Sequence, residues 1–131
     1  MKNVIFILFA LVVIIACNKK DDDNCLEYKS SFVVSVNAPS SGSINEDINV
    51  EIQFLIGGCE KFNEFKESTY ENTITIEVFI KHEGCICPDV AASTQGNYVF
   101  NSPTPGDYEL KFKSSGHNGN PEFIIANITI E

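Results

Sequence analysis

The strongest constraint on the fold is an alternation of apolar and polar residues with a period of two. Alternation of this kind places one face of an extended chain on a core and the other in water, so each run predicts a β-strand. No segment of the body shows a sustained 3.6-residue apolar repeat, which would indicate an amphipathic helix. The clearest apolar positions are Ile48, Val50, Ile52 and Phe54, then Ile74, Ile76, Val78 and Ile80, and then Tyr108, Leu110 and Phe112.

Turn-forming residues separate these runs, most clearly at Gly57-Gly58, at Glu83-Gly84 and in a stretch rich in Pro and Gly at 102–107. Glycine permits positive φ, and proline blocks continuation of a strand. Six or seven short strands at this spacing predict an all-β fold, a single antiparallel β-sandwich, with a small barrel as the alternative. The length of 131 residues fits one domain rather than two.

The N-terminus carries a short apolar leader. Residues 4–16 are an unbroken apolar run of 13 residues behind Lys2, and a membrane-spanning helix needs about 20. The run ends Ile14-Ile15-Ala16-Cys17, which resembles the lipobox of bacterial lipoproteins. The resemblance implies that Cys17 receives a diacylglycerol, that residues 1–16 are a cleaved signal peptide, and that the new N-terminus is acylated, for example with palmitate. An ordinary secretory signal or a short anchor helix is the alternative.

The segment after Cys17 is Asn18-Lys19-Lys20-Asp21-Asp22-Asp23-Asn24, which has no apolar residue and predicts a solvated tether. We therefore expect a lipidated and acidic tether at 17–30 and the β-sandwich at 31–131. Lysine followed by several aspartates is similar to the surface-export signal of Bacteroidota lipoproteins. That resemblance implies attachment to the cell outer membrane, with exposure at the cell surface as the finer expectation.

Four cysteines remain once Cys17 is lipidated: Cys25, Cys59, Cys85 and Cys87. An even number in a small exported domain predicts disulfide bonds. Cys85 and Cys87 are two residues apart, so a bond between them is strained on a strand. Either of the two remaining connectivities fits the sequence. A zinc or copper site formed by His82 with Cys85 and Cys87 is the alternative, although one residue between paired cysteines is unusual for zinc.

A second resemblance supports the sandwich. Residues 105–112, Pro-Gly-Asp-Tyr-Glu-Leu-Lys-Phe, resemble the turn-and-strand pattern Pro-Gly-x-Tyr-x-Leu-x-Phe of bacterial immunoglobulin-like and fibronectin-like domains. In those domains the glycine allows a tight turn and the alternate residues after the tyrosine enter the core. The resemblance implies an immunoglobulin-like sandwich. It says nothing about a ligand, because one fold hosts many functions.

The net charge of −9 disfavours nucleic acid as a partner, because phosphates repel acidic surfaces. No nucleophile elbow or phosphate-binding glycine loop is present, so neither an enzyme nor a cofactor is expected. The sequence favours a binding module with recognition on its loops. The candidate loops are 57–70, with Phe62, Phe65 and Tyr70, and 114–121. A chain without Trp lacks the flattest surface for stacking sugars, so a protein partner is favoured over a glycan. The alternative function is an envelope inhibitor or an accessory subunit of an enzyme or transporter.

Overall fold

A computed structural model describes residues 25–117 and 120–131, and this part of the chain is all-β. The prediction of a β-sandwich is confirmed, with nine strands rather than about seven. No helix long and apolar enough to cross a membrane occurs in this range. The strands are β1 (Leu26–Ser31), β2 (Val33–Asn37), β3 (Ser41–Gly42), β4 (Ile48–Gly57), β5 (Glu60–Tyr70), β6 (Thr73–Glu83), β7 (Ala91–Phe100), β8 (Gly106–His117) and β9 (Asn120–Ile130).

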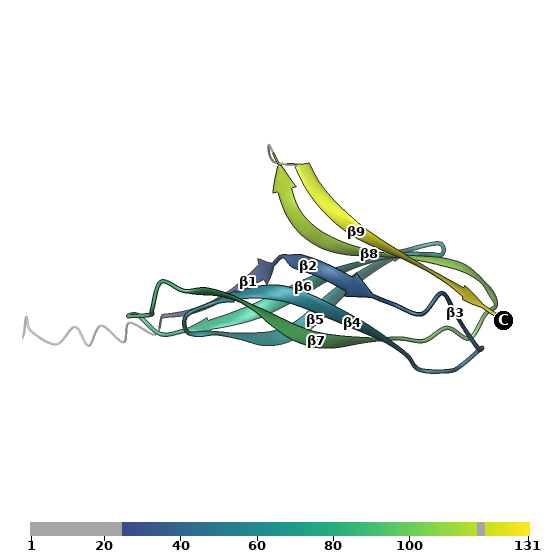
Figure 1. The fold of residues 1–131 in the computed structure, drawn as a ribbon, viewed down its shortest axis with the longest axis horizontal. Helices are drawn as coiled ribbons and strands as arrows, with labels where there is room; N and C mark the ends of the chain where they lie inside the picture. Colours follow the sequence, from purple (N-terminus) through teal and green to yellow (C-terminus); the bar gives the residue numbers. More distant parts are fainter. Residues whose placement is uncertain (1–24, 118–119) are drawn as a thin grey trace, which may run out of the picture.

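The strands form two facing sheets of unequal size (Figure 1). The larger has six strands in the order β1-β6-β8-β9-β3, with β5 on the other edge of β6. The smaller has three strands in the order β2-β4-β7. Most pairs are antiparallel, as the sequence predicts, but β6–β8 and β3–β9 are short parallel pairs. The chain changes sheets between β1 and β2, again before and after β3, and then after β4, β6 and β7.

One edge of β6 serves two different strands. β8 pairs with residues 73–76 of β6, and β1 pairs with residues 78–83. Because β1 occupies the remainder of that edge, β8 must leave the sheet beyond Phe112. Figure 1 shows the outer part of the β8–β9 hairpin diverging from the other strands.

The core lies between the two sheets and consists of the residues that the alternation selects. β4, β6 and β8 contribute every second residue, as a strand with one buried face requires. β7 and β9 add further residues at their C-terminal ends. The buried hydrophobic residues are Val33, Ile48, Val50, Ile52, Phe54, Ile74, Ile76, Val78, Ile80, Tyr98, Phe100, Tyr108, Leu110, Phe112, Ile128 and Ile130.

The folded body begins earlier than position 31. β1 spans Leu26–Ser31 and pairs with β6, so residues 26–30 belong to a sheet rather than to the expected tether. The switch from β1 to β2 buries Ser31 and Val33 and leaves Phe32 exposed at the surface. The expected leader, the lipidation site Cys17 and the acidic residues up to 24 lie outside the described residues.

Candidate functional site

Phe62, Phe65 and Tyr70 lie on strand β5. The prediction that 57–70 is a loop is wrong, because β5 pairs with β6 along its length, from Glu60 opposite His82 to Tyr70 opposite Thr73. A two-residue turn at Gly58-Cys59 precedes the strand. A register shift between residues 62 and 64 marks a β-bulge, which inserts one residue and breaks the period of two. The bulge explains why the strand is not apparent in the sequence.

The bulge also brings Phe62 and Phe65 together, although they are three residues apart. Their ring centroids are 4.8 Å apart, and the Phe62 ring lies 5.9 Å from that of Phe54 on β4. Phe65 in turn meets Tyr98 edge-on at 5.4 Å. Phe54 is 1% exposed, whereas Phe62 is 46% exposed. The aromatic rings therefore form a continuous apolar path from the core to the surface.

This path forms one wall of a cleft of about 340 Å³ between the two sheets. The cleft opens between β5, at the edge of the larger sheet, and β7, at the edge of the smaller sheet. We call it the β5–β7 cleft and define it by Phe54, Phe62, Phe65, Thr94, Gly96 and Asn97.

Gly96 lets the backbone of β7 lie close against the aromatic core beside the cleft. A Cβ atom at this position would lie 2.9 Å from Cε1 of Phe54, closer than such atoms normally approach. With glycine there, the backbone of β7 packs directly on the Phe54 ring, which is 1% exposed. A glycine inside a strand often marks such a close approach or a ligand site.

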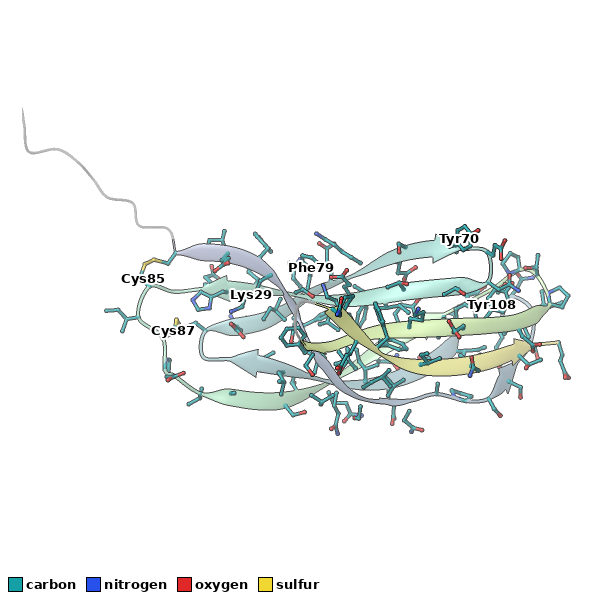
Figure 2. The ribbon with its side chains drawn as sticks, turned by 90° about the horizontal axis from the view of Figure 1, so that it is seen from above. Lys29, Tyr70, Phe79, Cys85, Cys87 and Tyr108 are labelled. Carbon is teal, nitrogen blue, oxygen red and sulfur yellow. A yellow bond between two sulfur atoms is a disulfide. The ribbon has the colours of Figure 1, made fainter. Side chains whose placement is uncertain are left out.

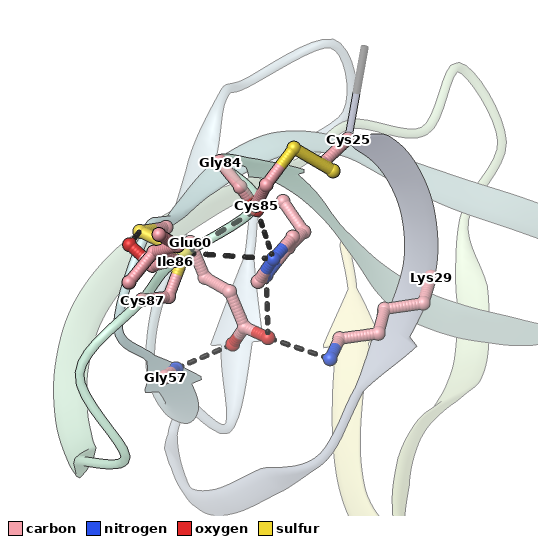
Figure 3. Close-up of a disulfide and its surroundings, with 10 residues drawn as sticks. Cys25, Lys29, Gly57, Glu60, Gly84, Cys85, Ile86 and Cys87 are labelled. Atoms are coloured by element: carbon pink, nitrogen blue, oxygen red, sulfur yellow. Dashed lines mark hydrogen bonds and ion pairs between the residues drawn. A yellow bond between two sulfur atoms is a disulfide. The ribbon is translucent and has the colours of Figure 1, made fainter. Parts of the chain in front are cut away.

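The rim of the cleft next to the β4–β5 turn is held by Glu60, whose side chain is 9% exposed. Its carboxylate accepts a hydrogen bond from the Gly57 N–H and lies 2.6 Å from Nζ of Lys29 on β1 (Figure 3). Burial alone would raise the pKa of Glu60, but the hydrogen bonds from Lys29 and Gly57 outweigh it and hold the pKa below 4.5. The interaction with Glu60 raises the pKa of Lys29 above 10.5. This ion pair fixes the turn against β1.

Tyr70 does not join the cleft. It is 76% exposed and lies at the far end of β5, beside the end of the molecule that holds Tyr108 (Figure 2). The other predicted loop, 114–121, is the tip of the β8–β9 hairpin, and its residues 118–119 lie outside the described range. Of the three predicted aromatic residues, the structure brings together Phe62 and Phe65.

The four cysteines form two disulfides, Cys25–Cys85 and Cys59–Cys87. Both bind the connection between β6 and β7, one to the start of β1 and the other to the β4–β5 turn (Figure 3). The prediction of disulfides is therefore confirmed. Because the sulfurs of Cys85 and Cys87 are bonded in this way, they are not available as thiolate ligands for the alternative metal site.

His82 lies beside the second disulfide rather than in a metal cluster. Its Nε2 is 3.1 Å from the carbonyl oxygen of Gly84 and 3.7 Å from Sγ of Cys87, and its Nδ1 is 3.6 Å from Glu60. In the described part of the chain, no three His, Cys, Asp or Glu side chains are grouped to hold a metal ion.

Sequence reasoning missed β7 as a wall of the cleft. The segment Ala91-Ala92-Ser93-Thr94-Gln95-Gly96 has small or polar residues at both faces, so alternation of apolar and polar residues does not identify it as a strand. Gly96 between strand-forming residues was the one available signal, because glycine in a strand interior usually has a structural reason.

Two facing sheets around a single apolar core define the protein as a β-sandwich domain. A family model for the ORF11 β-sandwich domain matches residues 48–125, from the start of β4 into β9. This match covers more than half of the chain, so the protein belongs to the ORF11 β-sandwich domain family. No curated protein matches the chain, and no solved structure does.

Proposed function

We propose that this protein is a lipid-anchored binding module of the cell envelope that captures a protein partner at the β5–β7 cleft. The observation that carries the proposal is the exposed ring of Phe62, which packs on the buried ring of Phe54 at the mouth of the cleft. Aromatic residues at the mouth of an apolar cleft provide the anchor that protein interfaces use most often. A non-catalytic role and the absence of a cofactor are part of this proposal.

The anchoring half of the proposal rests on the lipobox-like sequence that ends at Cys17. Cys25 follows Cys17 by eight positions, which is at most about 28 Å of extended chain. Cys25 is bonded to Cys85 at the end of the body that also holds the β4–β5 turn (Figure 2). With Cys17 in a membrane, this disulfide-bonded end is tethered to it, and Glu60 at the rim of the cleft lies next to the same end. Another envelope protein is then the partner within reach.

The chemistry of the cleft supports a protein partner over the other classes. The net charge of −9 opposes binding of nucleic acid or anionic headgroups. The aromatic residues of the cleft are phenylalanines set among polar residues of β5 and β7 rather than a broad flat platform, so they suit a single apolar side chain better than a sugar ring.

Two variants that each remove one exposed aromatic side chain from β5 test the proposal. Phe62→Ser alters the cleft, whereas Tyr70→Ser removes a more exposed ring at the other end of the same strand. The full chain and both variants are used to capture solubilised envelope proteins, with photochemical cross-linking before washing. We expect one cross-linked protein that is lost with Phe62→Ser and kept with Tyr70→Ser, while both variants unfold near the wild-type temperature.

Equal capture by all three proteins would refute the role of the cleft. If the single recovered protein is an enzyme or a transporter in stoichiometric amount, the module is an inhibitor or an accessory subunit of it. Processing is tested separately by intact mass. An unmodified Cys17 behind an uncleaved leader would refute anchoring and leave the cleft proposal intact.

A further inference from the structure

Strand β7 has one free edge. It pairs with β4 without a register shift, from Ala91 opposite Gly57 to Phe100 opposite Ile48. It is the last strand of its sheet, and no described strand pairs with its other side. That other side borders the β5–β7 cleft.

The direction of the backbone groups follows from the register. The N–H of Gly58 donates to the carbonyl of Val90, and the N–H of Leu55 donates to Phe32 on the opposite side of β4. In an antiparallel pair, successive residues turn their N–H and C=O groups to opposite edges. The N–H and C=O groups of Ser93, Gln95 and Asn97 therefore point away from β4, toward the free edge.

This edge lacks the features that normally keep strands from pairing with other chains. Exposed edges are usually protected by charged residues, proline or bulges. β5 has such protection, with five charged residues among its eleven and a bulge after Phe62. β7 is a regular ten-residue strand, AASTQGNYVF, with no charge and no proline. An unprotected edge of this length beside an apolar cleft is typical of strand addition.

We propose that β7 receives an extended segment of a protein partner as a fourth strand of the β2-β4-β7 sheet. The inference rests on the proposed function of the cleft, and it specifies the conformation and the chemistry of the partner. Hydrogen bonds to the main chain at Ser93, Gln95 and Asn97 hold the segment. Its alternate side chains enter the cleft beside Phe62 and Phe65.

The cleft determines which side chains the segment carries. Residues that face inward meet the rings of Phe62 and Phe65 in the cleft, so they are large and apolar. Residues that face outward lie beside the uncharged side chains of Ser93, Gln95 and Asn97 on a protein of net charge −9, so they are neutral or basic. A second copy of this chain fits less well, because the inward residues of β7 at this level are Thr94 and Gly96, too small to fill the cleft.

The test measures binding of fluorescent ten-residue peptides to the purified full chain by anisotropy. The panel alternates Val, Leu, Ile or Phe with Thr, Asn or Lys. Two further versions of the tightest-binding peptide are made. One carries backbone N-methyl groups on its odd-numbered residues and the other on its even-numbered residues, so each lacks one set of alternate N–H donors. We expect one N-methylated set to weaken binding at least about tenfold, which equals about 1.4 kcal/mol, and the other set to change it less than about twofold. These peptides leave the protein unaltered, so a folding defect cannot produce the result.

A protein variant provides the complementary measurement. Gln95→Pro removes one N–H that points to the free edge and leaves the hydrogen bonds to β4 in place. We expect it to lose peptide binding while keeping both disulfides and a cooperative unfolding transition. Tyr70→Ser serves as the control and is expected to bind the peptide as the wild type does.

The outcomes separate the inference from the function on which it rests. Loss of binding with Phe62→Ser, but no effect of either N-methylated set, would overturn strand addition and leave the cleft as a side-chain pocket. Normal binding by Phe62→Ser would refute the role of the cleft itself. Failure of every peptide to bind would overturn the inference. The inference would also be overturned if the wild type is a dimer and Gln95→Pro is a monomer, because a second copy of the chain would then be the occupant of the β7 edge.

Discussion

Removal of the Cys59–Cys87 disulfide is expected to destabilise the domain strongly. This bond joins the β4–β5 turn to the connection between β6 and β7, and both segments cross from one sheet to the other. The perturbation is the double variant Cys59→Ser with Cys87→Ser. Cys59 has a positive φ of 63°, and serine at that position keeps the same backbone strain. The variant therefore isolates the effect of the crosslink.

The magnitude follows from the length of chain that each bond closes. Cys59–Cys87 has a sequence separation of 28, which gives about 3.6 kcal/mol from the loss of chain entropy in the unfolded state. Cys25–Cys85 has a separation of 60, which gives about 4.3 kcal/mol. At about 4 °C per kcal/mol for a domain of this size, either loss lowers Tm by about 15 °C. Each value is a large share of the 5–15 kcal/mol that is typical of a whole domain.

Urea unfolding of the wild type and of the two double-serine variants, followed by circular dichroism, measures these losses. We expect both variants to be destabilised by about 3–4 kcal/mol and to differ from each other by less than about 1 kcal/mol. A loss below about 1 kcal/mol for the Cys59–Cys87 pair would refute the reasoning, because it would mean that the crosslink does not restrict the unfolded chain as the loop-entropy argument requires. An unchanged m-value would show that the variants still unfold as one unit.

Three further predictions concern the same fold. Glu60→Gln should flatten the pH dependence of the unfolding free energy below pH 4.5. The lowered pKa of Glu60 gives stability that is present above pH 4.5 and is lost as the pH falls through the pKa of the folded state. The same pH dependence in the variant as in the wild type would contradict this. Tyr108→Phe should cost about 1–2 kcal/mol in urea unfolding, because the phenol donates at 3.0 Å to a backbone carbonyl four residues earlier. Gly84→Ala should destabilise by at least about 1 kcal/mol, as φ is +149° and the new Cβ would lie 3.0 Å from two disulfide sulfurs; wild-type stability would contradict the assigned conformation.

The core could be predicted from the sequence because its signal is local. Ile48 to Phe54 and Ile74 to Ile80 alternate strictly, and the structure buries every second residue in both strands. The Pro105-Gly106 turn was also readable, since Gly106 has a φ of +147°, which glycine adopts at little cost. The apolar alternation and the strand and turn propensities of the residues agree at these positions, so tertiary contacts do not impose a different local structure.

The walls of the cleft could not be predicted, because the features that form them break the pattern. The bulge after Phe62 replaces alternation with a spacing of three, and the first half of β7 has no large apolar residue on either face. Only pairing with β6 and with β4 identifies these segments as strands. Information of that kind lies in contacts between residues far apart in the sequence.

The disulfide connectivity was unresolved for a related reason. Both pairings that were left open satisfy the sequence, and the choice depends on the register of β1 against β6. Leu26 pairs with Glu83, and the Gly84 N–H donates to the carbonyl of Cys25 at 2.9 Å. This register places Cys25 next to Cys85. Cys87, two residues further on, then reaches the turn that holds Cys59.

The unequal widths of the two sheets explain why the cleft opens where it does. A three-stranded sheet cannot cover the inner face of a six-stranded one, so β5 and its aromatic residues extend past β7. Exposed aromatic surface of this kind is unfavourable unless something covers it in the functional state. In our proposal, a partner strand beside β7 widens the smaller sheet at the point where Phe62 lacks a facing strand. The cleft and the unprotected edge are then two consequences of one missing strand. Phe62→Ser and Gln95→Pro should therefore both weaken binding of the same partner segment.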